Sequence, residues 1–207
     1  MPRIGKARDG AEPTSDDQRQ RQVRILDAAA RLGSEHELAR VQMTEVAKSA
    51  GVAIGTLYRY FPSKTHLFVA VLLHRLELGA SRLPARKPEM SARDAITEVL
   101  IEMTRRFVDR PLLASAMLLS NSTAPAAVVP DSEEVRRTFH RILFDKAGLD
   151  DPTEQDRNAV RLLSMMWSGL LVAYLNGAAT LEETEADLRS SCELLLVHLE
   201  ERTAETT

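Results

Sequence analysis

The sequence contains little of what secreted and membrane proteins need. Its single cysteine, Cys192, excludes an internal disulfide and fits a reducing compartment such as the cytoplasm. The first 24 residues contain no apolar segment of the kind found in a signal peptide. The longest uncharged apolar run, residues 162–175, is shorter than the roughly 18 residues that indicate a membrane span. We therefore expect a cytoplasmic protein with no membrane partner, in which this run is a buried helix.

Signatures of catalysis and of metal binding are also missing. The five histidines are scattered without metal-ligand spacing. There is no Gly-rich phosphate loop, G-x-S-x-G turn or paired-carboxylate arrangement. We expect no metal, no cofactor and no catalytic residue. A small helical enzyme and a helical adaptor that binds other proteins stay open as alternatives to the function reached below.

Aromatic residues make up only 4% of the 207 residues, while alanine and leucine are abundant, which favours helices over sheets. The formal net charge of −3 conceals an uneven distribution. Residues 1–82 contain 13 lysines and arginines against 9 acidic residues, whereas residues 83–207 contain 14 against 21. The balance is therefore +4 in the first part and −7 in the second. Positive charge is concentrated where a nucleic-acid-binding segment is expected.

Two short helices separated by a tight turn are predicted within residues 41–64, V-Q-M-T-E-V-A-K-S-A-G-V-A-I-G-T-L-Y-R-Y-F-P-S-K. The first spans residues 44–50 and ends at Gly51, because glycine adopts the left-handed backbone conformation easily. The second spans residues 54–60, since Pro62 cannot continue it, and Ser63 caps the next helix. Such a pair is typical of a helix-turn-helix whose second helix enters the DNA major groove. An ordinary helical hairpin fits the periodicity too.

The side chains of the second helix favour DNA binding. Ile54 and Leu57, three residues apart, are expected to face inward. Thr56, Tyr58 and Tyr60 are then left for the outer face and the ends, where a reader of phosphates and base edges needs polar groups.

Two neighbouring residues also suit an interface with DNA. Gly55 would let the backbone approach the duplex closely. Lys64, at the start of the following helix, would hold a phosphate as a point charge with help from the helix dipole.

The segment G-T-L-Y-R-Y-F-P-S-K, preceded by E-V-A-K-S-A-G-V and followed by an apolar helix, resembles the TetR family of one-component transcriptional regulators. The resemblance runs from about residue 21 to residue 72. It implies an all-α protein of nine helices that binds a palindromic double-stranded operator as a homodimer. Ala53 and Ile54 stand where many members have Ser or Thr followed by Lys, so the operator sequence stays open. By position, the family's DNA contacts match Gln42, Thr44, Gly55, Thr56, Tyr58, Tyr60 and Lys64.

The domain organisation follows from this resemblance. We expect a disordered arm over residues 1–14, a helix-turn-helix domain over residues 15–62, and a connecting helix over residues 63–82. Residues 83–207 would then form the ligand-binding and dimerisation domain.

Two C-terminal helices are expected to pair with those of a second subunit. One, starting near residue 152 and ending near 176, is apolar nearly all round, and the next, from about 180 to 201, carries a stripe of leucines. Such helices from two subunits would close a four-helix interface, which the family's dimers use. A monomeric core is the alternative.

Methionine and aromatic residues of the C-terminal part would surround one interior, which suits a lipophilic small molecule and suits a plain core equally. Residues 41–43, 52–67 and 110–117 resemble the KstR-type repressors of cholesterol and steroid catabolism. That resemblance implies a repressor released from its operator by a steroid-derived or fatty acyl-CoA thioester; another lipid or a hydrophobic drug is the alternative. The predicted lining is Met103, Phe107, Met117, Phe139, Met165, Met166, Trp167, Leu170 and Tyr174.

Overall fold

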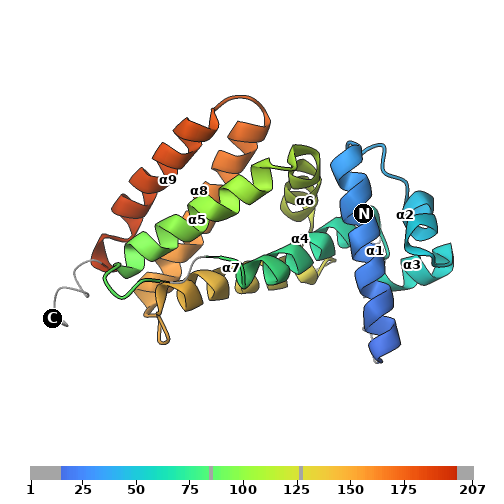
Figure 1. Ribbon diagram of the computed structural model, residues 1–207, viewed down its shortest axis with the longest axis horizontal. Helices are drawn as coiled ribbons and strands as arrows, with labels where there is room; N and C mark the ends of the chain where they lie inside the picture. The colour runs from blue at the N-terminus through green and yellow to red at the C-terminus, as the bar shows by residue number, and fades with distance from the viewer. Residues whose placement is uncertain (1–14, 84–85, 126–127, 200–207) are drawn as a thin grey trace, which may run out of the picture. The chain divides into compact units, whose positions relative to one another are not determined.

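The computed structural model describes residues 15–83, 86–125 and 128–199, and in these ranges it contains the nine labelled α-helices, a further short helical stretch at residues 197–199, and no β-strand (Figure 1). The predicted all-α class is confirmed. The predicted arm of residues 1–14 lies outside the described residues. In chain order the helices are α1 (Asp16–Glu35), α2 (Met43–Ala50), α3 (Ile54–Tyr60), α4 (Lys64–Ala80), α5 (Ala92–Val108), α6 (Pro111–Thr123), α7 (Asp131–Ala147), α8 (Glu154–Leu175) and α9 (Leu181–Leu195).

Several helices begin at side-chain caps. Ser15 caps α1, because its hydroxyl oxygen accepts a hydrogen bond from the Gln18 amide at 3.3 Å. The helix α8 starts slightly later than predicted, since Thr153 is the cap and Asp156 completes a capping box with it. Towards the end of the chain, α9 stops at Leu195, and after a bend at Leu196 residues 197–199 are helical again. The predicted end near residue 201 lies outside the described residues.

The described residues pack into two compact units. One comprises those up to Arg75 together with Leu112–Val135, and the other comprises Leu76–Pro111 and those from Arg136 onward. The connecting helix α4 contributes residues to both units. Nearly all of α6 belongs to the first unit, although its residues fall within the predicted ligand-binding domain of residues 83–207.

The core of the first unit joins the helix-turn-helix to α1 and α4. Ile25, Leu57 and Phe68 have no exposed surface, and α1 lies beside α2, which lies beside α3 (Figure 1). Gly33 on α1 packs tightly against Phe68 of α4. A Cβ atom at this position would lie 2.7 Å from Cε1 of Phe68 and 3.2 Å from Cδ1 of Leu113. Only a glycine lets these helices pack so tightly.

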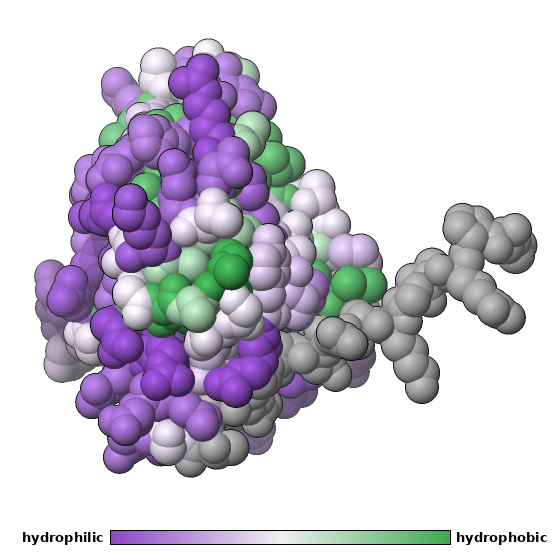
Figure 2. All heavy atoms as spheres, turned by 90° about the vertical axis from the view of Figure 1, so that its right-hand side faces the viewer, coloured by the Kyte–Doolittle hydropathy of each residue, from purple (hydrophilic) through white to green (hydrophobic). Residues whose placement is uncertain are grey.

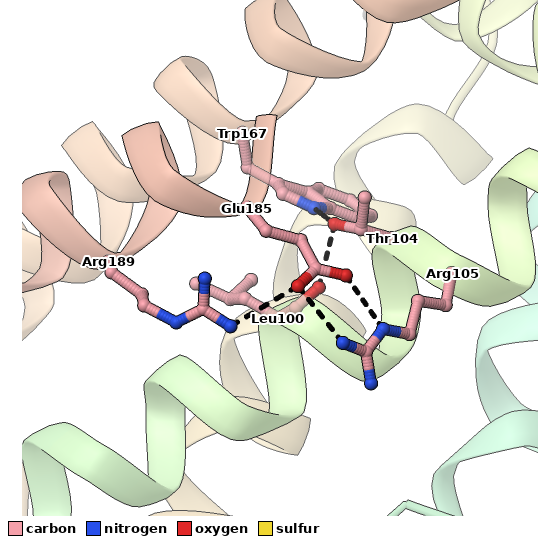
Figure 3. Close-up of polar contacts among 6 residues, drawn as sticks. All are labelled: Leu100, Thr104, Arg105, Trp167, Glu185 and Arg189. Atoms are coloured by element: carbon pink, nitrogen blue, oxygen red, sulfur yellow. Dashed lines mark hydrogen bonds and ion pairs between the residues drawn. The ribbon is translucent and has the colours of Figure 1, made fainter. Parts of the chain in front are cut away.

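In the second unit, a buried hydrogen bond joins α8 to α5. The indole N–H of Trp167 donates to Oγ1 of Thr104 at 2.8 Å, and the Thr104 hydroxyl donates to the Leu100 carbonyl at 2.8 Å (Figure 3). Trp167 is 5% exposed and Thr104 is fully buried. Since a buried donor without a partner costs about 1–3 kcal/mol, this chain of bonds fixes the register of the two helices.

An ion-pair cluster joins α9 to α5 beside that bond. The guanidinium group of Arg105 donates two hydrogen bonds to the Glu185 carboxylate, at 2.7 and 2.9 Å, and Arg189 donates a third at 3.2 Å (Figure 3). These bonds, led by those from Arg105, lower the pKa of Glu185. The carboxylate therefore stays charged well into the acidic range, and the bidentate geometry aligns α5 with α9.

The helix α8 has a second apolar face that its own unit leaves uncovered. Leu163, Trp167 and Leu171 are buried, whereas Met165 is 63% and Val172 is 45% exposed. The expectation that the whole run is buried is therefore wrong. With 22 residues, α8 is long and apolar enough to cross a membrane by length and composition alone, a test that the core helix of a soluble protein also passes.

The contact at Gly33 yields a stability test. Gly33→Ala should destabilise the fold by about 1–3 kcal/mol, because the buried Phe68 ring cannot move away from the added methyl group. Gly79→Ala is the matched control, since its Cβ would meet only Nη1 of Arg106, at 3.9 Å. Urea denaturation at equal protein concentration measures both. A Gly33→Ala variant as stable as the parent would show that the close packing does not exist.

Candidate nucleic-acid interface and ligand-binding helices

The turn between α2 and α3 is built around Gly51. This residue has φ of 66° and ψ of 38°, and its N–H reaches the carbonyls of Ala47 and Lys48, which ends α2. The amide of Val52 also donates to the Ala47 carbonyl, at 3.0 Å. Two helices of eight and seven residues joined by this short turn form a helix-turn-helix, as the sequence predicted.

The side chains predicted to contact DNA have different exposures. Tyr58 is 48% exposed, Gln42 and Thr44 are exposed, and Thr56 is half-buried. At Gly55, an added Cβ would meet nothing within 4 Å. Figure 2 looks from the side on which α2 and α3 lie in Figure 1 and shows mainly hydrophilic residues around a small apolar patch. A polar face with an open backbone position suits the approach of a duplex.

Two orientations predicted for α3 are wrong. Ile54, expected to face inward, is 38% exposed, since it is the first helical residue and its side chain leans back over the turn. Tyr60, expected on the outer face or at the end of the helix, is the last helical residue but is only 4% exposed, since it lies three residues beyond the buried Leu57 and shares its face. Arg59 donates to the Tyr60 hydroxyl at 3.4 Å, and its guanidinium carbon lies 5.2 Å from the ring centroid. Tyr60 is therefore first a packing residue, and its contact with DNA stays a prediction for the hydroxyl group.

Lys64 has backbone partners that the sequence did not indicate. Its ammonium group donates to the carbonyl of Leu38 at 2.9 Å and to that of Ala39 at 3.4 Å. The side chain thus ties the start of α4 to the loop between α1 and α2. The predicted phosphate contact stays a prediction, and a Lys64 variant would disturb the fold and the interface together.

His66 also forms hydrogen bonds within the first unit. Its Nε2 lies 2.9 Å from the Val128 carbonyl and its Nδ1 lies 2.8 Å from the Ser63 hydroxyl. Because a carbonyl can only accept, Nε2 carries the proton, and in a neutral ring Nδ1 accepts from the serine. The ring joins α4 to the segment before α7.

In the second unit, three aromatic rings from α5, α7 and α8 meet. Trp167 stacks on Phe139 with 4.9 Å between ring centroids and contacts Phe107 edge-on at 5.3 Å. Such arrangements stabilise by about 0.5–1.5 kcal/mol beyond the area that they bury. The cluster is the centre of the predicted apolar interior.

The other residues of the predicted lining divide into three groups. Met103 is buried in this unit, and Met166, Leu170 and Tyr174 are half-buried. Met117 is buried in the first unit instead. Met165 does not line an interior at all, since it lies two residues, more than half a turn, from both Leu163 and Trp167 and is 63% exposed. Its inclusion was wrong because composition does not show which face of an apolar helix points inward.

A cavity of about 530 Å³ that is open to solvent lies elsewhere in this unit, between α7, the start of α8 and the loop that joins them. None of the nine predicted residues lines it. Five of its twelve lining residues are arginines, which the sequence analysis did not single out. The lining is Arg136, Arg137, His140, Arg141, Phe144, Asp145, Leu149, Asp150, Pro152, Arg157, Asn158 and Arg161.

Within the described ranges, no group of three His, Cys, Asp or Glu residues has the geometry to hold a metal ion. Cys192 is 1% exposed, and burial raises the pKa of its thiol, so the thiolate that would react is disfavoured.

Comparison with known proteins identifies both parts of this architecture. A family profile described as "Bacterial regulatory proteins, tetR family" matches residues 25–71, and one described as "Tetracyclin repressor-like, C-terminal domain" matches residues 90–195. The chain belongs to the TetR family. As a TetR-family member it is a DNA-binding transcriptional regulator and not an enzyme, as predicted.

Several TetR-family relatives are similar over most of their length. The "HTH-type transcriptional repressor KstR" of Rhodococcus jostii (strain RHA1) is 36% identical over 88% of this chain and 86% of its own. The KstR of Mycobacterium tuberculosis (strain ATCC 25618 / H37Rv) is 31% identical over 90% and 85%. A crystal structure of a TetR transcriptional regulator from Rhodococcus sp. RHA1 is 50% identical, with a TM-score of 0.84 over 88% of this chain and 98% of that one.

The open position at Gly55 gives a test of the DNA-binding face. Gly55→Ala should leave folding stability unchanged or slightly raised, since the methyl group meets nothing and alanine favours helix. It should weaken operator binding by roughly tenfold, about 1.4 kcal/mol, if the backbone lies against DNA. Fluorescence anisotropy with labelled DNA from upstream of the chain's own gene measures the affinity, with Gly79→Ala as control. Parental affinity in Gly55→Ala would remove this position from the interface.

Proposed function

We propose that this TetR-family chain is a cytoplasmic repressor that binds a palindromic operator as a homodimer and leaves it when a lipophilic effector binds. The observation that carries the proposal is the 36% identity to the repressor KstR over 88% of the chain. The exposed side chains of Gln42, Thr44 and Tyr58 and the half-buried Thr56, on α2, α3 and the cap of α2, support DNA reading.

A second copy of the chain is the proposed partner for the uncovered face of α8 and α9. Leu162 is 44%, Met165 63% and Val172 45% exposed on α8, and Leu194 on α9 is 79% exposed. Exposed apolar side chains gathered on neighbouring helices mark interaction sites. A twofold axis would bury this face on both copies and present two recognition helices to half-sites about 34–36 Å apart.

A steroid-derived acyl-CoA thioester is the first effector that we propose, and long-chain acyl-CoAs come next. The relatives named KstR support the first. FadR from Bacillus subtilis, solved in complex with stearoyl-CoA, shares the fold alone, at 20% identity and a TM-score of 0.59 over 84% of this chain and 96% of its own. Phe107, whose ring contacts Trp167, and Met166, which precedes Trp167 in the chain, are both half-buried. They offer the adaptable apolar surface that a lipid needs.

Control of DNA binding requires the effector to prefer one state of the dimer. A ligand with equal affinity for both states shifts nothing. The helix α4 contributes residues to both units and is therefore the proposed route of coupling. A coupling free energy of about 1–3 kcal/mol would weaken operator binding some 5- to 150-fold.

The dimer is tested by placing a charge on the uncovered face. Met165→Glu should leave the fold of each subunit intact, because this side chain is 63% exposed, and should favour the monomer, because the charge would be buried on pairing. Sedimentation velocity at micromolar concentration measures the state. Gln155→Glu, exposed in the first turn of the same helix, adds the same charge and should stay dimeric. A parent chain that sediments as a monomer would refute the proposed interface.

The effector is tested by anisotropy on the same labelled DNA. Steroid-derived acyl-CoA thioesters should lower operator affinity some 5- to 150-fold. The Met166→Arg variant should bind DNA normally but should no longer respond to the thioester. Trp167 is unsuitable for this change, since its loss would leave the buried Thr104 contact unmade. If neither thioesters nor a broad panel of lipophiles alters operator affinity or thermal stability, the sensor part of the proposal fails, while the DNA-binding part stands.

A further inference from the structure

Arginines on two helices line one cavity of the second unit. Arg137 and Arg141 lie four residues apart on α7, and Arg157 and Arg161 lie four apart on α8. Residues at this spacing share one face of a helix. The cavity between the two faces, about 530 Å³, is open to solvent, and all five of its arginines are exposed and accessible to a ligand from solution.

The lining of this cavity carries more positive than negative charge. Its lining holds five arginines and only two carboxylates, Asp145 and Asp150. Arg141, Arg157 and Arg161 form no ion pair with any residue in the described ranges. Like charges gathered in this way repel one another, so an anion that enters the cavity would stabilise the folded protein.

The chemistry of the lining selects among anions. A guanidinium group is a planar fork that matches two phosphate oxygens at once, and several such groups favour a ligand with more than one phosphate. Phe144 and Leu149 line the same space and provide an apolar surface for a flat ring. Phosphates attached to a purine or pyrimidine combine both features, whereas an inorganic anion would leave the apolar part unused.

We propose that the cavity between α7 and α8 binds a nucleotide group bearing two or more phosphates. The group can be a free nucleotide or the adenosine 3′,5′-bisphosphate end of a coenzyme A thioester. The second source rests on the proposed function, in which such a thioester is the effector; the first does not. In either case Arg141 and Arg161 bind phosphate, and Phe144 contacts the base.

Isothermal titration calorimetry of the full chain tests this site with adenosine 3′,5′-bisphosphate, free coenzyme A, AMP and pyrophosphate. The bisphosphate and coenzyme A should bind more tightly than AMP or pyrophosphate, and their affinity should fall as salt rises. Arg141→Ala with Arg161→Ala should weaken binding by roughly tenfold or more, the scale of one to two lost charged hydrogen bonds. Arg110→Ala removes an exposed arginine outside the cavity and should bind like the parent.

The outcomes distinguish a failure of the nucleotide site from a failure of the proposed function. If neither the bisphosphate nor coenzyme A binds at millimolar concentration in low salt, or if the double variant keeps the parental affinity, the nucleotide site is overturned. If the double variant instead loses operator affinity without any ligand present, the arginines serve DNA, and the site is again overturned. If the nucleotides bind but no thioester alters operator binding, the site stands and the proposed effector fails.

Discussion

The recognition surface depends on the burial of a few side chains beneath it. The helices α2 and α3 have eight and seven residues, and isolated helices of that length are not stable in water. They persist because Val46 and Leu57 have no exposed surface and α1 and α4 complete the core around them. The exposed side chains of the outer face, such as Tyr58, are not needed for this core and can serve DNA.

Local chemistry made this part of the fold predictable, and the ends of α3 show where prediction stopped. Gly51 and Ser63 act through their own backbone and their nearest neighbours, so helix bounds could be inferred without tertiary contacts. Ile54 and Tyr60 each lie three residues from the buried Leu57, yet only Tyr60 is buried, so periodicity alone does not decide between inside and outside at the ends of so short a helix. Lys64 bonds to carbonyls 25 and 26 residues away, which no local pattern indicates.

For the second unit, the sequence predicted which helices meet, but it predicted less well which of their faces are buried. Methionine and aromatic residues did mark the helices that meet around Trp167, since large apolar side chains rarely stay in water. Met165 was misplaced because α8 has two apolar faces, and only the packing of α5 and α9 shows which one is covered. The arginine pairs of α7 and α8 are visible in the sequence at a spacing of four. That both pairs line one cavity is tertiary information.

The exposure of Ile54 has a consequence for the operator. An aliphatic side chain at the start of the recognition helix offers no hydrogen bond, and 38% of its surface is open to solvent. In the major groove, the apolar group that such a side chain would contact is the C5-methyl group of thymine, which distinguishes this base there. Selectivity at that position would come from apolar area removed from water, so it would persist at salt concentrations that weaken every phosphate contact.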